Sequence, residues 1–487
     1  MRTIRRILFW CVVGIYLIAC PLTILYALGY VFKPGVGNRL MKTGLIYLAT
    51  APPGATIYVS TSRYIRRTPA ILRNLLPGDY SIRLSLKDYQ PWTRIVPVRG
   101  EHATVLQHII LFPNNWKPQI LTDDAFESLV PVSAARVLLL SRGPRLQDMV
   151  VYDRRTGSKR PLFATRTEWL NAVLLELFTV PDSPYVVLRI DLQGSERFLH
   201  LDLDDADGRP DDVTRLLQTR PMRLDWPPLD RRHLFVLQDG YLSRLDLASR
   251  AVYPHLVEHI RGYGFCHRTG YVLTEDMLLH RMEFDARSAE PFTEGRPIDL
   301  SALHSNSFIR IGCLSNEALT FWSERGQLLV TDAEHRLIEQ EVRGIEPDSH
   351  RQRVLVWRRD RLGILERATS SDDNGPARPP AIRWVYPQGK HIEQAFWVHG
   401  DAHVLLRDDD RLVFVELETA GTARFSELWS VKRGSSIAYN DESGKIEYLD
   451  RDTGRLCAVE FLPKRELLSL SLPERAERQP RHDPSAP

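Results

Sequence analysis

The chain begins with one long apolar segment and then changes to short alternating segments. From Ile7 to Phe32 no side chain carries a charge. A bilayer core about 30 Å thick is crossed by a helix of roughly 20 apolar residues. The segment therefore predicts a transmembrane helix over residues 7–32, after a cytoplasmic head over residues 1–6. Pro21 predicts a kink in that helix.

Two interpretations of this segment both attach the body of the protein to a membrane. The basic head is too short to be more than a leader, which favours an N-terminus inside the cell. The difference in charge between the two sides of the segment is small and supports this orientation only weakly. The alternative is a lipoprotein signal, because Leu17-Ile18-Ala19-Cys20 is similar to a lipobox and cleavage there would leave a lipidated Cys20. The apolar character that continues to Phe32 favours the uncleaved anchor.

After a linker over residues 33–43, residues 44–113 have the pattern of a small β domain. Leu45–Leu48 and Thr56–Val59 flank a Pro-Pro-Gly-Ala turn, and alternating segments follow at Ser81–Ser85 and Val105–Leu111. Pro-Gly pairs favour tight turns. Large aromatic side chains would fill much of the core, because a domain of this size buries little apolar surface.

This order of signals resembles the PEGA domain, a small β-sandwich-like module of bacterial and archaeal envelope proteins. A proline stands in place of the glutamate of the naming tetrapeptide, and Asp88 replaces the usual glycine before the tyrosine. The resemblance implies an adhesive, spacer or surface-layer-associated role, not catalysis. The matching motifs are Pro52-Pro53-Gly54-Ala55, Thr68-Pro69, Leu75-Leu76-Pro77-Gly78-Asp79-Tyr80 and Tyr89-Gln90-Pro91-Trp92.

From residue 114 to residue 472 one arrangement recurs: an apolar run, a polar turn, an alternating strand and a second turn. The intervals between copies, 33 to 50 residues, suit four-stranded propeller blades. No long amphipathic segment interrupts them, so we expect an all-β body that forms a propeller of seven or eight blades, with eight favoured. The eight copies open at Val137, Tyr185, Leu234, Tyr271, Leu319, Val354, Val404 and Ile437.

We expect strands from both ends of the body to close this propeller, because an open array would leave free strand edges. The candidates are Gln119–Leu121 and Leu467–Leu472. The tail over residues 473–487 has no apolar period and is expected to be disordered. Asp225-Trp226-Pro227-Pro228 is similar to the Trp-Ser-Pro-Asp-Gly turn of the WD40-like repeats in TolB-type periplasmic propellers, and Tyr152–Gly157 resembles one of their outer hairpins.

Composition excludes one class of partner. The 64 basic and 61 acidic residues are interleaved along the chain, which leaves a formal charge of +3. A nucleic-acid-binding protein typically shows a basic stripe or domain, so no nucleic acid is expected as a partner.

The five cysteines form no C-x-x-C pair, and two of them lie in the apolar segment. The other three, Cys266, Cys313 and Cys457, cannot all pair within one chain. We favour small buried hydrophobic residues at these positions. A Cys266–Cys313 bridge stays open as an alternative.

The sequence predicts no catalytic residue, cofactor site or metal site. His399 and His403 in His-Gly-Asp-Ala-His are candidate metal ligands, but a turn that leads into a strand need not bring the two side chains together. Asp408–Asp410 and Asp202–Asp207 are candidate calcium ligands, but the segment Asp202–Asp207 lacks the glycine and glutamate of an EF-hand loop. We interpret both, and Arg358–Arg361, as solvated turns.

These observations predict a single-pass, membrane-anchored, non-enzymatic scaffold of the cell envelope. Residues 7–32 would contact the lipid bilayer, and the body, periplasmic or extracellular, would present its propeller to other envelope proteins. The alternative is an enzyme or ligand sensor with its site in the central channel. Converging His, Asp, Glu and Arg side chains around a pocket would favour that alternative, and a smooth apolar or charged patch would favour docking.

Overall fold

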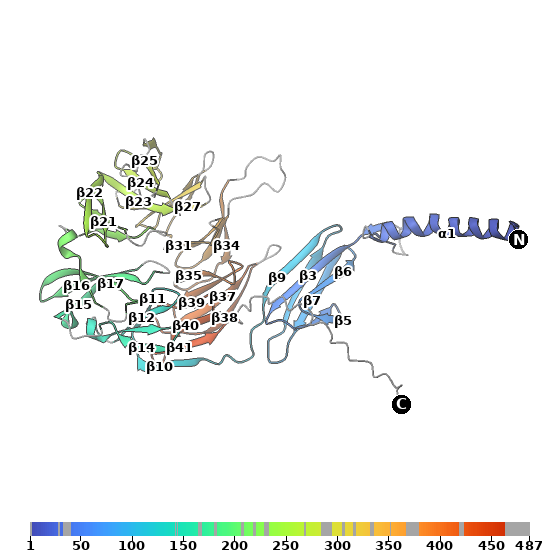
Figure 1. Ribbon diagram of the computed structural model, residues 1–487, viewed down its shortest axis with the longest axis horizontal. Helices are drawn as coiled ribbons and strands as arrows, with labels where there is room; N and C mark the ends of the chain where they lie inside the picture. The colour runs from blue at the N-terminus through green and yellow to red at the C-terminus, as the bar shows by residue number, and fades with distance from the viewer. Residues whose placement is uncertain are drawn as a thin grey trace, which may run out of the picture.

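The computed structural model of the protein consists of one long helix, a small β domain and a large β body (Figure 1). The helix extends away from the small domain on the side opposite the body. The described residues are 2–27, 30–32, 40–141, 143, 145–163, 168–179, 183–205, 209–217, 221–227, 233–266, 269–283, 295–303, 307–314, 318–331, 336–350, 352–366, 379–417 and 423–462.

The N-terminal segment differs from its prediction. Helix α1 spans Arg2–Ala27, and strands β1 (Tyr30–Phe32) and β2 (Leu40–Lys42) then form an antiparallel hairpin. The apolar run therefore leaves the helix before Phe32, and part of the predicted linker is strand. Among the described residues, none of the helices combines the length and the apolar character that a bilayer crossing needs, so the predicted transmembrane helix is not supported.

The small domain is built from two facing sheets, in the strand orders β6-β3-β9 and β5-β4-β7-β8. Side chains alternate between buried and exposed along its strands, which places Ile46, Leu48, Ile82 and Leu84 in a common core. The predicted strands are confirmed. Their bounds are β3 (Gly44–Ala51), β4 (Thr56–Val59), β5 (Ser62–Arg67), β6 (Ala70–Leu75), β7 (Gly78–Ser85), β8 (Trp92–Val98) and β9 (Ala103–Ile110).

The body consists of eight four-stranded units, here called blades 1 to 8. Blades 1 to 4 are β11 (Ser128–Pro131), β12 (Arg136–Leu140), β13 (Met149–Asp153) and β14 (Ser158–Pro161); β15 (Val173–Thr179), β16 (Tyr185–Leu192), β17 (Ser195–Asp202) and β18 (Asp211–Asp212); β19 (Arg223–Asp225), β20 (His233–Gln238), β21 (Tyr241–Asp246) and β22 (Ala251–Val257); and β23 (Ile260–Cys266), β24 (Thr269–Thr274), β25 (Leu278–Glu283) and β26 (Arg296–Pro297).

Blades 5 to 8 continue the series, and the last one takes its outermost strand from the start of the body. They are β27 (Ile309–Leu314), β28 (Ala318–Ser323), β29 (Leu328–Thr331) and β30 (Arg336–Glu339); β31 (Gly344–Pro347), β32 (Arg353–Trp357), β33 (Leu362–Glu366) and β34 (Ala381–Tyr386); β35 (Ile392–Val398), β36 (His403–Asp408), β37 (Arg411–Glu416) and β38 (Arg424–Ser430); and β39 (Ala438–Asn440), β40 (Lys445–Leu449), β41 (Arg455–Glu460) and β10 (Gln119–Ala125).

The apolar runs located the blades correctly. Seven of the eight predicted openings lie in the second strand of a blade, and Ile437 directly precedes β39. The closure prediction is half right. Gln119–Leu121 belongs to β10, but this strand pairs with β41, Gln119 opposite Ala458. Residues 467–472, the predicted partner, lie outside the described residues.

Apolar side chains fill the space between neighbouring blades. In the described part of the chain, seven clusters of buried residues join consecutive blades from blade 1 round to blade 8. An eighth packs Leu449 and Leu456 of blade 8 against Leu129 and Leu139 of blade 1, so the order of blades closes on itself. Among the described residues, eight four-stranded units in a closed order, two of which share one eight-stranded sheet, are consistent with the blades of a β-propeller.

The first strands of blades 4 and 5 pair directly with each other. β23 runs parallel to β27, and a Cβ atom at Gly262 or Gly264 would overlap a carbonyl oxygen of β27, so only glycine permits this approach. The same contact brings Cys266 and Cys313 to a Cα–Cα distance of 6.0 Å, and they form a disulfide. The favoured interpretation, free buried thiols, is wrong for this pair. Cys457 is a buried free thiol, as predicted.

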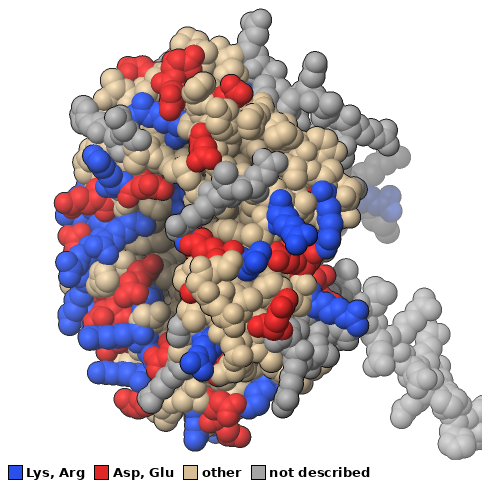
Figure 2. Space-filling model, turned by 90° about the vertical axis from the view of Figure 1, so that its left-hand side faces the viewer, with Lys and Arg blue, Asp and Glu red and all other residues tan. Residues whose placement is uncertain are grey.

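Charged side chains of both signs are interleaved over the face of the body that points away from α1 (Figure 2). This distribution agrees with the interleaved charges of the sequence. The body therefore presents no extended field of one sign on this face.

Candidate functional site

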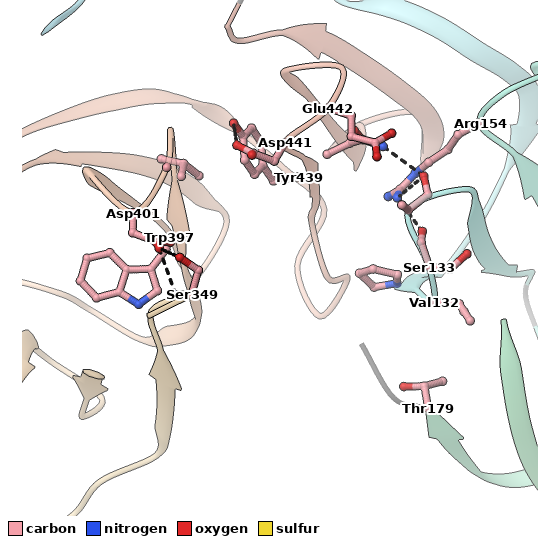
Figure 3. A pocket seen from close by; sticks show the side chains of 15 residues that line it. Val132, Ser133, Arg154, Thr179, Ser349, Trp397, Asp401, Tyr439, Asp441 and Glu442 are labelled. Carbon is pink, nitrogen blue, oxygen red and sulfur yellow. Dashed lines mark hydrogen bonds between the residues drawn. The ribbon is translucent and has the colours of Figure 1, made fainter. Parts of the chain in front are cut away.

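The first strands of five blades end around one hollow of about 640 Å³, here called the mouth hollow (Figure 3). Its lining comes from the ends of β11, β15, β35 and β39, from the loops that follow β11, β31, β35 and β39, and from Arg154 in the turn after β13. Such a convergence places the hollow at one end of the centre of the ring, and no local sequence motif indicated a site there. The lining residues are Pro131–Ala134, Arg154, Thr179, Ser349, Trp397, Val398, Gly400, Asp401 and Tyr439–Glu442.

One wall of the mouth hollow is the turn between β35 and β36. His399, Gly400 and Asp401 have φ values of 58°, 64° and 61°, a left-handed run that costs free energy at the two residues that are not glycine. The turn is held by Ser349, whose backbone N–H donates to Asp401 Oδ2 at 2.9 Å and whose hydroxyl donates to the same oxygen. Arg353 donates to the Asp401 carbonyl oxygen at 2.6 Å, which fixes the turn from a second side.

The opposite wall joins blades 8 and 1 through Arg154. Its Nε donates to Glu447 Oε2 at 2.7 Å, and its Nη1 donates to the Ser133 carbonyl oxygen at 2.8 Å. Burial raises the pKa of the Glu447 carboxyl, and the positive charge of Arg154 opposes that rise. Asn440 donates to the Ala134 carbonyl oxygen at 3.0 Å, so the same two blades are joined twice.

The polar groups of the mouth hollow therefore bind mainly to one another. Besides the pairs above, the Tyr439 hydroxyl donates to Asp441 Oδ1 at 3.1 Å. Trp397 donates its indole N–H to the Glu346 carbonyl oxygen at 3.2 Å and lies beneath the Arg353 guanidinium, 4.5 Å from the ring centre. The wall is thus a rigid, mixed surface of aromatic and hydrogen-bonded polar groups.

The Glu346 carboxyl, also on this side of the ring, has a pKa shifted towards neutrality. It belongs to β31, and although its side chain reaches solvent, the surrounding blades raise the pKa of the carboxyl to about 7. The carboxyl is therefore partly protonated at neutral pH. Sequence reasoning missed it, because nothing in Gly-Ile-Glu-Pro indicates that distant segments desolvate this carboxylate.

The two histidines considered as metal ligands do not form a site. His403 Nδ1 accepts the Leu417 backbone N–H at 3.2 Å, so Nε2 carries the proton and donates to the His108 carbonyl oxygen at 2.6 Å. Burial lowers the pKa of His403 to about 3, which keeps the ring neutral. Among the described residues, no three His, Cys, Asp or Glu side chains lie where they could hold a metal ion.

The acidic run at Asp408–Asp410 is not a simple solvated turn. Asp408 is fully buried and accepts hydrogen bonds from the Tyr386 hydroxyl, at 3.1 Å, and from the backbone N–H groups of Lys390 and His391. The prediction is wrong for this residue, because a hairpin end of blade 7 packs against blade 6. The next two aspartates point elsewhere: Asp409 pairs with Arg433 at 2.6 Å and Asp410 with Arg451 at 3.0 Å.

The remaining candidate turns have local structural roles. Asp202 Oδ1 accepts the Asp204 backbone N–H at 2.9 Å, which is a turn contact, and residues 206–207 lie outside the described residues. Arg358 is mostly buried, pairs with Glu339 and lies 5.6 Å from the ring centre of Trp384, so the solvated-turn interpretation is wrong for this arginine.

The sequence resemblance of the small domain is confirmed by a family comparison. Residues 43–109 match the PEGA domain. The match covers the two-sheet unit and not the body. No curated protein matches the chain in sequence.

Several solved structures are similar to the chain at low scores. BamB from Moraxella catarrhalis aligns with a TM-score of 0.43 and 11% identity, over 70% of this chain and 99% of that one. PorZ of Porphyromonas gingivalis, described as a bacterial surface component of the type-IX secretion system, aligns with a TM-score of 0.37 and 12% identity, over 68% and 42%. Hsv2 of Kluyveromyces lactis aligns with a TM-score of 0.40 and 8% identity, over 63% and 98%. Similarity at this level carries no information about ligands or partners.

Proposed function

We propose that the protein is a non-enzymatic scaffold of the cell envelope that holds a partner protein at its mouth hollow. The observation that carries this proposal is the state of the lining polar groups. Asp401, Arg154 and Asn440 are already engaged by groups of neighbouring blades. A surface whose polar groups are fixed in this way suits a protein loop that packs against the half-buried ring of Tyr439.

The junction between the PEGA domain and blade 7 supports the scaffold role. Trp92 donates its indole N–H to Glu416 Oε1 at 3.0 Å, and Arg424 donates to the Thr93 carbonyl oxygen at 2.6 Å. Ile110 of β9 packs in the same apolar cluster as blades 7 and 8. These contacts fix the body relative to the PEGA domain, so the PEGA domain can act as a rigid spacer.

Two further observations support a location outside the cytoplasm, next to a membrane. The Cys266–Cys313 disulfide is a bond that persists in oxidising compartments. Helix α1 exposes large apolar side chains, including Phe9 at 63% and Trp10 at 69%, and uncovered apolar surface of this kind is typical of a membrane or protein contact. We place the bilayer contact in this segment, with the N-terminus inside and the body outside.

A photo-crosslinking residue at Asp441, in the intact protein in its native membrane, tests the docking role. A single crosslinked protein partner is expected from this position. The same residue at Glu324, exposed in the turn between β28 and β29 at the other ends of the strands, is the matched control. Equal crosslinking at both positions, or none at Asp441, contradicts docking at the mouth hollow. Protease added to spheroplasts should digest the body, and full protection contradicts its external location.

A ligand sensor is the second candidate, because a hollow of about 640 Å³ is within the range of small-molecule pockets. This alternative predicts that a small molecule raises the melting temperature of the protein and that Asp441→Ala removes the effect. No protein would then crosslink at the mouth hollow.

A further inference from the structure

One edge of the PEGA domain exposes several basic side chains and an apolar one, and no acidic side chain on either of its two strands. This basic edge consists of Arg63, Ile65, Arg66 and Arg67 on β5 and Arg73 on β6. All five are exposed, and the Ile65 side chain is 100% exposed. None of the four arginines pairs with a carboxylate of a described residue, so their charges are available to a partner.

The charge distribution along the sequence points in the same direction. The first 78 residues contain ten basic residues and no acidic residue, and the first carboxylate is that of Asp79. The rest of the chain holds 54 basic and 61 acidic residues, so the surplus of positive charge lies entirely in the N-terminal part. A one-sign surface on a protein that elsewhere interleaves its charges favours an anionic partner.

The hairpin after α1 keeps the PEGA domain close to the end of the helix. Tyr30 pairs with Lys42, and only Thr43 separates Lys42 from β3. The three residues from Ala27 to Tyr30 span at most about 10 Å. Figure 1 shows β5 and β6 on the edge of the domain that faces away from the body, on the side to which α1 extends. The basic edge therefore faces the membrane that α1 is proposed to contact.

We propose that the basic edge docks onto anionic phospholipid headgroups beside the point where α1 meets the membrane. This inference rests on the membrane attachment proposed above. Guanidinium groups bind phosphate oxygens through two parallel hydrogen bonds, and Ile65 between them adds an apolar contact with the interface. Such docking requires close approach of the arginines to the headgroups, because the screening length at physiological ionic strength is about 8 Å. Docking would hold the PEGA domain, and the body fixed to it, in one orientation.

Hydrogen exchange of the full chain bound to vesicles tests this inference. The vesicles contain either phosphatidylcholine alone or a mixture with phosphatidylglycerol. Amide exchange over residues 62–67 should be about tenfold slower on the mixed vesicles. The double variant Arg66→Glu/Arg67→Glu should lose this protection, and Ile65→Ser should weaken it without a change in charge. The matched control Arg325→Glu/Arg359→Glu makes the same charge change at exposed positions of the body and should keep it.

The outcomes distinguish headgroup docking from the membrane attachment through α1 on which it rests. Equal exchange of residues 62–67 on the two lipids, with the protein still bound to both, overturns headgroup docking and leaves the attachment through α1 intact. The arginines would then only keep the free edge of β5 from pairing with other chains. A protein that floats with neither vesicle overturns the membrane attachment itself. Loss of protection in the control pair would show a general charge effect and also overturns the docking.

Discussion

Replacing Glu416 by alanine should loosen the PEGA domain from the body. Glu416 accepts the Trp92 indole N–H at 3.0 Å and lies 3.5 Å from Arg94 Nη1. The side chains of Arg94 and Glu416 are only 6% and 13% exposed. The substitution therefore leaves a buried guanidinium without this carboxylate and a largely buried N–H without its acceptor.

The magnitude follows from these two losses. Removing one partner of a buried ion pair costs about 3–5 kcal/mol, and an orphaned buried donor costs about 1–3 kcal/mol. Water that reaches the partly open Glu416 site reduces both losses, so we expect about 3 kcal/mol for Glu416→Ala. Glu416→Gln keeps an acceptor for Trp92 and removes only the charge, so it should cost less, about 2 kcal/mol.

Limited proteolysis at Phe112 and Trp116 measures this opening, because both residues lie between the PEGA domain and β10 and pack in the cluster of blades 7 and 8. The urea dependence of cleavage gives the free energy of opening for each variant. The double variant Arg94→Met/Glu416→Leu should recover the part of the loss that comes from the guanidinium, since it removes both charges, whereas the Trp92 N–H still lacks the Glu416 acceptor. An opening free energy for Glu416→Ala within about 0.5 kcal/mol of the parent would refute this account of the junction.

Three other predictions concern the same fold. His403 has a folded-state pKa of about 3, below the value near 6.5 of an unfolded chain. Because the unfolded form binds the extra proton, the junction should lose about 2 kcal/mol of stability between neutral pH and pH 5. Limited proteolysis of the His403→Gln variant should show a weaker pH dependence. A chain that ends at Leu462 should melt like the full chain, because it keeps the pairing of β10 with β41. A chain that ends before Arg455 loses β41 and should lose cooperative unfolding by calorimetry. Reduction of the disulfide, or Cys266→Ser, should lower the free energy of unfolding by about 4 kcal/mol, because the bond joins residues separated by 47 positions. Urea unfolding with and without reductant measures this loss, and an unchanged free energy would contradict a formed bond.

Local pattern determined the strands and most of their limits. The strand predicted at Leu45–Leu48 lies in β3, along which the more buried and the less buried side chains alternate, and the apolar runs at Val137 and Val404 lie in the buried second strands of their blades. These features follow from the two-residue period of a strand with one buried face. The sequence also determined the PEGA domain, since its turn motifs are contiguous and specific.

Tertiary structure decided the features that join distant segments. The pairing of β10 with β41 joins the two ends of the body, and a strand pattern in β10 does not indicate which distant segment lies beside it. Cys266 and Cys313 pair because two glycines let β23 approach β27. The burial of Asp408 and the lining of the mouth hollow depend on side chains from different blades. Strand periodicity reports which face of a segment is buried, but it carries no information about which other segment covers that face.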